Sequence, residues 1–207
     1  IAQSIILWVD QAASMSFQSD NNPTKATRAR TLALAMAILL IRGGERVGLT
    51  GLRPPPRRGE AQLMRMAQLL REHYTTDYGA PEAQGMLPHS RALFVSDFLG
   101  DIKPVEEALL RAADRGVRGT LLQVLDPQEE AFPFDGRTIV QSMTGAMEHE
   151  TLKAGDLKDR YLTRLAERKD RLAHLARTTG WQFSTHHTGE TATSAVLWAY
   201  GAMERHA

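Results

Sequence analysis

The sequence of 207 residues contains no cysteine. Small secreted folds held by disulfides, zinc ribbons, iron–sulfur proteins and enzymes with a cysteine nucleophile all require thiol groups, so these classes are excluded. The sequence also has little net charge, because 25 basic side chains nearly balance 24 acidic ones. Proteins dedicated to nucleic-acid binding usually carry a strongly basic face. We therefore expect no nucleic-acid partner.

Long hydrophobic runs are missing as well. The most apolar stretch, Leu32 to Ile41, is much shorter than the roughly 20 residues that cross a bilayer. We expect a buried helix there and no membrane span in this chain. The content of hydrophobic residues, 43%, is sufficient for one soluble core. We expect a single domain over residues 1–207, which starts at Ile1 and not at methionine and so is a piece of a longer protein.

Short apolar strands alternate with amphipathic helices along the chain. We expect strands at residues 4–9, 46–50, 92–95, 120–125 and 181–185, and a weaker pair of strands around 138–141 and 146–148. Helices are expected at residues 24–41, 60–73, 104–115, 156–179 and 191–205, with Thr24 and Asp156 as N-caps. Strands joined by helices imply right-handed crossovers. The sequence therefore predicts an α/β fold with a doubly wound, mostly parallel sheet flanked by helices.

An aspartate follows the first and the third predicted strands. Val9 leads into Asp10, and Ser96 leads into Asp97. In open α/β sheets, ligands bind outside the carboxyl ends of the strands, where the strand order reverses. In the common doubly wound order these two strands are neighbours, so both carboxylates face one spot. Carboxylate oxygens at one spot suit Mg²⁺ or Mn²⁺, although an aspartate after a strand also commonly caps the next helix.

Several motifs occur together in an order that resembles the von Willebrand factor A-like domain. They are Leu7-Trp8-Val9-Asp10-Gln11-Ala12-Ala13-Ser14-Met15-Ser16, Lys25 at a helix start, Glu45-Arg46-Val47-Gly48-Leu49, Phe94-Val95-Ser96-Asp97-Phe98 and Val124-Leu125-Asp126-Pro127. The most similar subset is the bacterial family called domain of unknown function 58. The resemblance covers nearly the whole chain. It implies a three-layer, Rossmann-type sandwich with a metal-ion-dependent adhesion site at one edge of the sheet.

The resemblance also implies which residues hold the metal. In the family, ligands come from the motif D-x-S-x-S after the first strand, from a threonine in a middle loop and from an aspartate after a later strand. Asp10, Ser14 and Asp97 match these positions, and the pair Thr75-Thr76 could supply the threonine. Ala12 stands at the first serine position and has no oxygen to give. We expect a degenerate site that binds Mg²⁺ or Mn²⁺ weakly or not at all.

The function that the resemblance implies is a non-catalytic protein-interaction module. In related domains the partner supplies an acidic side chain as the last metal ligand, and proteins of the family are often linked with MoxR-type AAA+ ATPases. We therefore expect a protein partner, with a MoxR-type AAA+ ATPase as the candidate. The expected location is the cytoplasm or the cytoplasmic face of the membrane.

Two alternative functions stay open. The first is a metal-assisted hydrolase that uses the same crevice, which needs a general base near Asp10 and Asp97 that the sequence does not name. Ser14 lacks the Gly-x-Ser-x-Gly turn that presents a serine nucleophile, and His186-His187 lacks the spacing of a helical zinc pair. The second is a structural domain of a larger membrane-associated protein. No Gly-rich phosphate-binding motif follows a strand, so we expect no bound nucleotide.

Overall fold

The protein is built around a five-stranded parallel sheet with the strand order β2-β1-β3-β4-β7. The computed structural model describes residues 2–50, 55–72, 76–82, 86–132, 138–141, 148–151 and 154–204. The five strands are β1 (Ser4–Val9), β2 (Arg46–Leu49), β3 (Arg91–Ser96), β4 (Arg118–Leu125) and β7 (Gln182–His187). A separate antiparallel pair is formed by β5 (Thr138–Gln141) and β6 (Glu148–Thr151).

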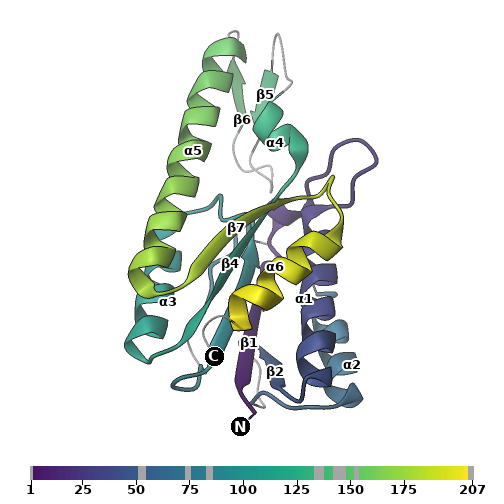
Figure 1. The fold of residues 1–207 in the computed structure, drawn as a ribbon. Helices are drawn as coiled ribbons and strands as arrows, with labels where there is room; N and C mark the ends of the chain where they lie inside the picture. The colour runs from purple at the N-terminus through teal and green to yellow at the C-terminus, as the bar shows by residue number, and fades with distance from the viewer. Residues whose placement is uncertain are drawn as a thin grey trace.

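Helices cover both faces of the sheet, so the domain has three layers. The helices are α1 (Lys25–Arg42), α2 (Glu60–Leu69), α3 (Ile102–Asp114), α4 (Pro127–Ala131), α5 (Ala154–Thr179) and α6 (Ala192–Glu204), with a short 3₁₀ helix η1 (Ala13–Ser16) after β1. One face carries α1, α2 and α6, and the opposite face carries α3 and α5 (Figure 1). This arrangement confirms the predicted α/β fold with a doubly wound parallel sheet.

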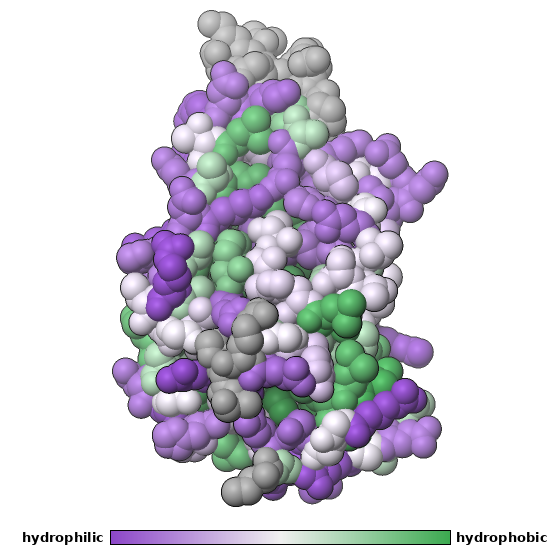
Figure 2. All heavy atoms as spheres, viewed as in Figure 1, coloured by the Kyte–Doolittle hydropathy of each residue, from purple (hydrophilic) through white to green (hydrophobic). Residues whose placement is uncertain are grey.

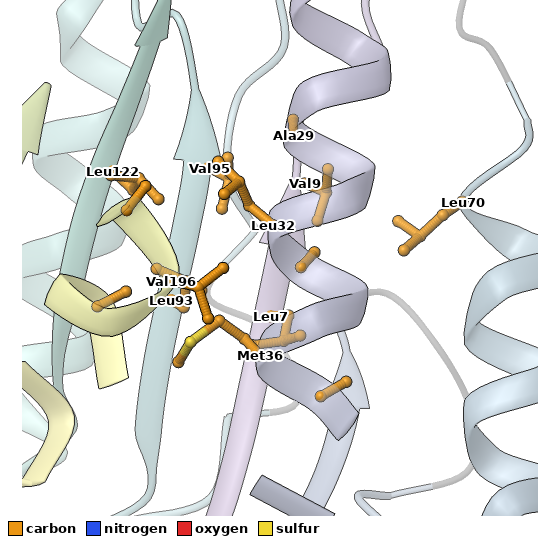
Figure 3. Packing of buried hydrophobic residues seen from close by; sticks show 14 of the residues in the cluster. Leu7, Val9, Ala29, Leu32, Met36, Leu70, Leu93, Val95, Leu122 and Val196 are labelled. Atoms are coloured by element: carbon orange, nitrogen blue, oxygen red, sulfur yellow. The ribbon is translucent and has the colours of Figure 1, made fainter. Parts of the chain in front are cut away.

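Each face of the sheet has its own hydrophobic core, because successive side chains of a strand point to opposite sides. Leu7 of β1 packs toward Leu32 and Met36 of α1, as Figure 3 shows. The next residue, Trp8, faces the other helical layer, and its ring centroid lies 5.8 Å from that of Phe94. These side chains are almost fully buried, and each contributes about 1.5–3 kcal/mol through removal from water. The central strands β1 and β3 are therefore buried on both sides, as is typical of a covered parallel sheet.

The strand order places the predicted site at a topological switch point. From β1 the chain moves outward to β2, and β3 then lies on the opposite side of β1. Val9 and Val95 are paired in the register of β1 and β3. Both strands end at the same edge of the sheet, which we call the carboxyl edge. The prediction that these two strands are neighbours is confirmed.

Most predicted elements are present, with shifted ends. Helix α3 begins at Ile102 with Asp101 as its N-cap, so Pro104 lies in its first turn as predicted. Helix α1 has Thr24 as N-cap, as predicted. Helix α5 begins at Ala154, so the prediction that Asp156 is its N-cap is wrong. The short helices η1 and α4 were not predicted, because a run of four or five residues shows no helical periodicity.

One part of the surface is unusually apolar. Leu197 of α6 is 64% exposed, and Ile38 and Leu39 of α1 are 38% and 39% exposed. Figure 2 shows apolar surface gathered where α6 packs beside α1. This area lies on a helical layer and not at the carboxyl edge.

Candidate functional site

Asp10 lies at the end of β1 and is almost completely buried, with 2% of its surface exposed. Its N–H donates to the carbonyl of Val95 at 2.9 Å, which continues the β1–β3 ladder. Its carboxylate accepts hydrogen bonds from the Ala12 N–H at 2.9 Å and from the Ser96 hydroxyl at 2.7 Å. The Gly79 N–H is a third donor. Burial raises the pKa of Asp10 above its ordinary value although these donors oppose the shift.

Gly79 covers the Asp10 carboxylate from the loop that precedes β3. A β carbon at this position would lie 2.2 Å from Asp10 Oδ1, so only glycine allows such a close approach. The backbone of this loop is also fixed by Ala13 and Ser14, whose N–H groups donate to the carbonyls of Thr76 and Asp77 at 2.9 Å. The loop therefore closes over Asp10 and separates its carboxylate from bulk water.

Asp97 follows β3 and is buried to the same degree, with 1% exposed. One carboxylate oxygen, Oδ1, accepts the Leu99 N–H at 3.0 Å, and the Asp97 carbonyl accepts the side-chain amide of Gln123 at 2.9 Å. The other oxygen, Oδ2, lies 2.9 Å from the ammonium nitrogen of Lys25. Asp97 is thus held in place by its own loop, by β4 and by a buried cation.

Lys25 also belongs to this edge of the sheet, although the spacing of residues along the sequence did not predict its place there. It is the first residue of α1, directly after the N-cap Thr24, and only 1% of it is exposed. Its ammonium lies 2.9 Å from Asp97 Oδ2 and 2.5 Å from Glu129 Oε1, and 5.9 Å from the centre of the Phe17 ring. Burial lowers the pKa of Lys25, but the charges of Asp97 and Glu129 outweigh burial and raise this pKa above its ordinary value. Lys25 is therefore charged in the folded protein.

The residues that follow β4 complete this edge. Asp126 is fully buried and accepts hydrogen bonds from the backbone and side chain of Ser19, from the Gln128 N–H and from the Thr188 hydroxyl. Glu129 closes a capping box, because its side chain accepts the Asp126 N–H at 2.9 Å. The sequence Asp126-Pro127-Gln128-Glu129 carries the signal of such a helix start, with an aspartate N-cap, a proline in the first position and a glutamate three residues after the cap.

The other predicted metal ligands lie near Asp10. Ser14 is 2% exposed, and its hydroxyl has no hydrogen-bond partner among the residues that the structure describes. Ala12 is buried and provides only a backbone N–H to the carboxylate of Asp10. Thr76 is exposed on the Gly79 loop, and Thr75 lies outside the described residues. The metal-binding role of Asp10, Ser14 and Asp97 stays a prediction.

The donor set does not fit a divalent cation. Both oxygens of Asp10 accept hydrogen bonds from the protein, and both oxygens of Asp97 are engaged by an N–H group and by the Lys25 ammonium. Among the described residues, no group of three histidine, aspartate or glutamate side chains is arranged to hold a metal ion. Of Asp10, Ser14 and Asp97, Ser14 alone has a side-chain oxygen without a hydrogen-bond partner among the described residues, and a single hydroxyl is far from the six oxygens that Mg²⁺ prefers.

A cavity of about 600 Å³ opens beside Asp10 at the carboxyl ends of β1 and β2. The C-terminal end of α2 and the Gly79 loop form its other walls. Its described lining includes the acidic residues Asp10, Glu72 and Glu82 and contains no lysine, arginine or histidine. Tyr78, which is 45% exposed, stands at this cavity. Because the Gly79 loop shields Asp10, the exposed carboxylates of Glu72 and Glu82 give this cavity its negative charge, and Tyr78 gives it aromatic surface.

The two histidines at the end of β7 contact other residues. His186 is buried against Arg28, and burial together with this positive charge lowers the pKa of His186, so its ring is neutral at pH 7. His187 Nε2 lies 2.6 Å from a carboxylate oxygen of Glu130, and Glu190 lies within 3.5 Å of both rings. These contacts engage the imidazoles with residues other than Asp10 and Asp97.

The all-parallel sheet of this order, with helices on both faces and an aspartate after each of two adjacent strands, is a von Willebrand factor A-like fold. More particularly, the chain belongs to the family described as protein of unknown function DUF58, whose model matches residues 2–171. The family resemblance predicted from the sequence is thereby confirmed. No curated protein matches the chain.

Two solved structures are similar over almost their full length. One is the conserved hypothetical protein BatB from Bacteroides thetaiotaomicron, 11% identical, with a TM-score of 0.50 and coverage of 97% of this chain and 98% of that chain. The other is an aerotolerance-related membrane protein from Bacteroides fragilis, 12% identical, with a TM-score of 0.53 and the same coverage. At this identity the similarity establishes the fold. Within the part of the chain described by the structure, no helix has the length and apolar character to cross a membrane.

Proposed function

We propose that this domain is a non-catalytic protein-interaction module that presents its carboxyl edge to a partner protein. The observation that carries this proposal is the open, acidic cavity beside Asp10, which lies next to a network of charged groups that are already paired inside the protein. An interaction module needs an accessible surface held rigidly in one shape. The hydrogen bonds around Asp10, Asp97 and Asp126 provide that rigidity.

The same contacts favour binding over catalysis. A metal-assisted hydrolase requires a free carboxylate or imidazole close to the reacting atoms. Asp10 and Asp97 use their oxygens for internal hydrogen bonds, and His186 and His187 contact Arg28 and acidic side chains of their own neighbourhood. We therefore rank the hydrolase below the interaction module.

The charge of the cavity indicates what kind of group a partner brings. Its described lining carries carboxylates and no basic side chain, so a lysine or arginine of the partner fits it better than an acidic residue. The partner that we propose is a MoxR-type AAA+ ATPase, and the proposed location is the cytoplasm or the cytoplasmic face of a membrane. Recognition of this kind needs no metal bridge between the two proteins.

The proposal is tested with a purified MoxR-type ATPase from the same organism, immobilised for a binding assay against this chain. Glu72→Arg places a positive charge at the cavity and should weaken binding about 10-fold or more, equivalent to about 1.4 kcal/mol. Glu107→Arg on α3 is the matched control, because Glu107 is 66% exposed on the other helical layer, and it should change affinity less than about 2-fold. Equal binding of wild type and Glu72→Arg would place the contact elsewhere, and no binding of the wild type would exclude this ATPase.

A further inference from the structure

The charge at the carboxyl edge is neutralised from within the chain. Lys25 approaches from the start of α1 and contacts one carboxylate that follows β3 and another that belongs to α4. Asp97 and Glu129 are both largely removed from water, with 1% and 12% of their side chains exposed. Buried carboxylates without a nearby positive charge are strongly unfavourable, so this edge requires a cation. The ammonium of Lys25 provides it.

The ammonium also occupies the oxygen that a metal would need. Asp97 Oδ2 is 2.9 Å from Lys25 Nζ, while Oδ1 accepts the Leu99 N–H, so both oxygens already have a partner and the ammonium repels a second cation. On the side of Asp10, the loop at Gly79 lies so close that a single added carbon would approach the carboxylate to 2.2 Å. A divalent ion could therefore enter only if Lys25 moved away.

We propose that Lys25 is the resident cation of this edge and takes the place of the divalent metal that the fold family implies. The carboxyl edge then keeps the same structure at any concentration of Mg²⁺ or Mn²⁺. Removal of the ammonium frees Asp97 Oδ2 and Glu129 Oε1, which become oxygen ligands for a hard divalent ion. This inference goes beyond the proposed function, because it concerns the site's own cation and holds with or without a partner.

The test is a titration of Mn²⁺ into the whole chain, followed by the loss of the free Mn²⁺ signal in electron paramagnetic resonance. We expect no saturable binding by the wild type up to about 1 mM, and the same melting temperature in EDTA and in Mg²⁺. Lys25→Ala should bind Mn²⁺ at least about 10-fold more tightly than the wild type, and its melting temperature should rise when Mn²⁺ is added. The double variant Lys25→Ala/Asp97→Asn should lose this gain.

Lys103→Ala is the matched control, because it removes an exposed lysine of α3 and should leave Mn²⁺ binding unchanged. If Lys25→Ala does not fold in EDTA, folding recovered with Mn²⁺ and not with Na⁺ supports the proposal equally. Should it fold in neither, Lys25→Gln is titrated instead, since its amide keeps a polar end on the side chain without the charge. Saturable Mn²⁺ binding by the wild type, or no gain of binding in the folded Lys25 variants, would overturn the proposal.

Discussion

Replacement of Lys25 with methionine isolates the contribution of the buried ammonium to stability. Methionine keeps an unbranched side chain of similar length, so the packing beside Phe17 changes little, but Asp97 and Glu129 lose their common partner. Breaking a buried ion pair by removing one member typically costs about 3–5 kcal/mol, because the remaining charge stays in a poorly solvated place. Since the whole domain is expected to have about 5–15 kcal/mol of stability, this is a large fraction.

The loss of stability in Lys25→Met should depend on pH in a defined direction. In the wild type, burial lowers the pKa of Lys25 but the two carboxylates outweigh burial and raise it above 10.5. A raised folded-state pKa means that the stabilisation by Lys25 is complete below the pKa of the unfolded chain and is lost as the pH rises through the folded-state pKa. Burial raises the pKa of Glu129 against the pull of Lys25, so in Lys25→Met this carboxylate takes up a proton more readily, and the loss of stability should be largest near pH 8 and smaller near about pH 5.

Urea unfolding followed by circular dichroism measures this directly. The triple variant Lys25→Met/Asp97→Asn/Glu129→Gln removes all three charges and should recover most of the loss, to within about 1.5 kcal/mol of the wild type. Lys103→Met, an exposed lysine, should change the free energy of unfolding by less than about 0.5 kcal/mol. A loss below about 1 kcal/mol for Lys25→Met, or a loss that grows toward acidic pH, would refute the reasoning.

Three further substitutions test the surroundings of the site. Asp126→Ala removes the acceptor of several buried hydrogen bonds and should lower the free energy of unfolding by about 2–3 kcal/mol in urea at neutral pH. Burial raises the pKa of Asp126, but these hydrogen bonds outweigh burial and hold it below 3.8, so its contribution is present above pH 3.8 and the difference from the wild type should vanish as the pH falls through the folded-state pKa. Gly79→Ala forces a carbon to within 2.2 Å of Asp10 and should lower the melting temperature by about 4–8 °C, whereas an unchanged value would mean that the loop does not cover Asp10. Gly119→Ala places a carbon 2.2 Å from the carbonyl of Ala92 on the neighbouring strand, so we expect a loss of more than about 3 kcal/mol, seen as a low yield of soluble folded protein.

The regular elements could be predicted because their signals are local. The apolar run over residues 4–9 predicts β1 with its observed ends, and Thr24 predicts the start of α1, where its side chain accepts the Thr27 N–H. The predicted ends of helices were less accurate where more than one residue nearby could begin or end the helix. Helix α2, expected to reach residue 73, ends at Leu69, and α5 begins two residues before Asp156.

The positions of the two strand-end aspartates could also be predicted. A parallel sheet brings the carboxyl ends of neighbouring strands to one edge, so Asp10 and Asp97 had to meet there once the strand order was known. The missing oxygen at Ala12 already indicated a weakened metal site. The replacement cation was not predicted, because Lys25 is separated from Asp97 by 72 residues and from Glu129 by 104 residues, and no local pattern joins them.

By itself, the sequence determined the fold class and the family, the alternation of buried strands with helices, and the placement of two carboxylates at one edge. The family follows from the resemblance of its motifs, and the other features follow from the period of apolar residues, from helix caps and from the geometry that every parallel sheet shares. Only the tertiary structure decided which groups contact the two carboxylates at that edge. Whether a carboxylate binds a metal, a ligand or a lysine depends on which distant group is buried against it and on how much water remains, and packing brought Lys25 to within 2.9 Å of Asp97.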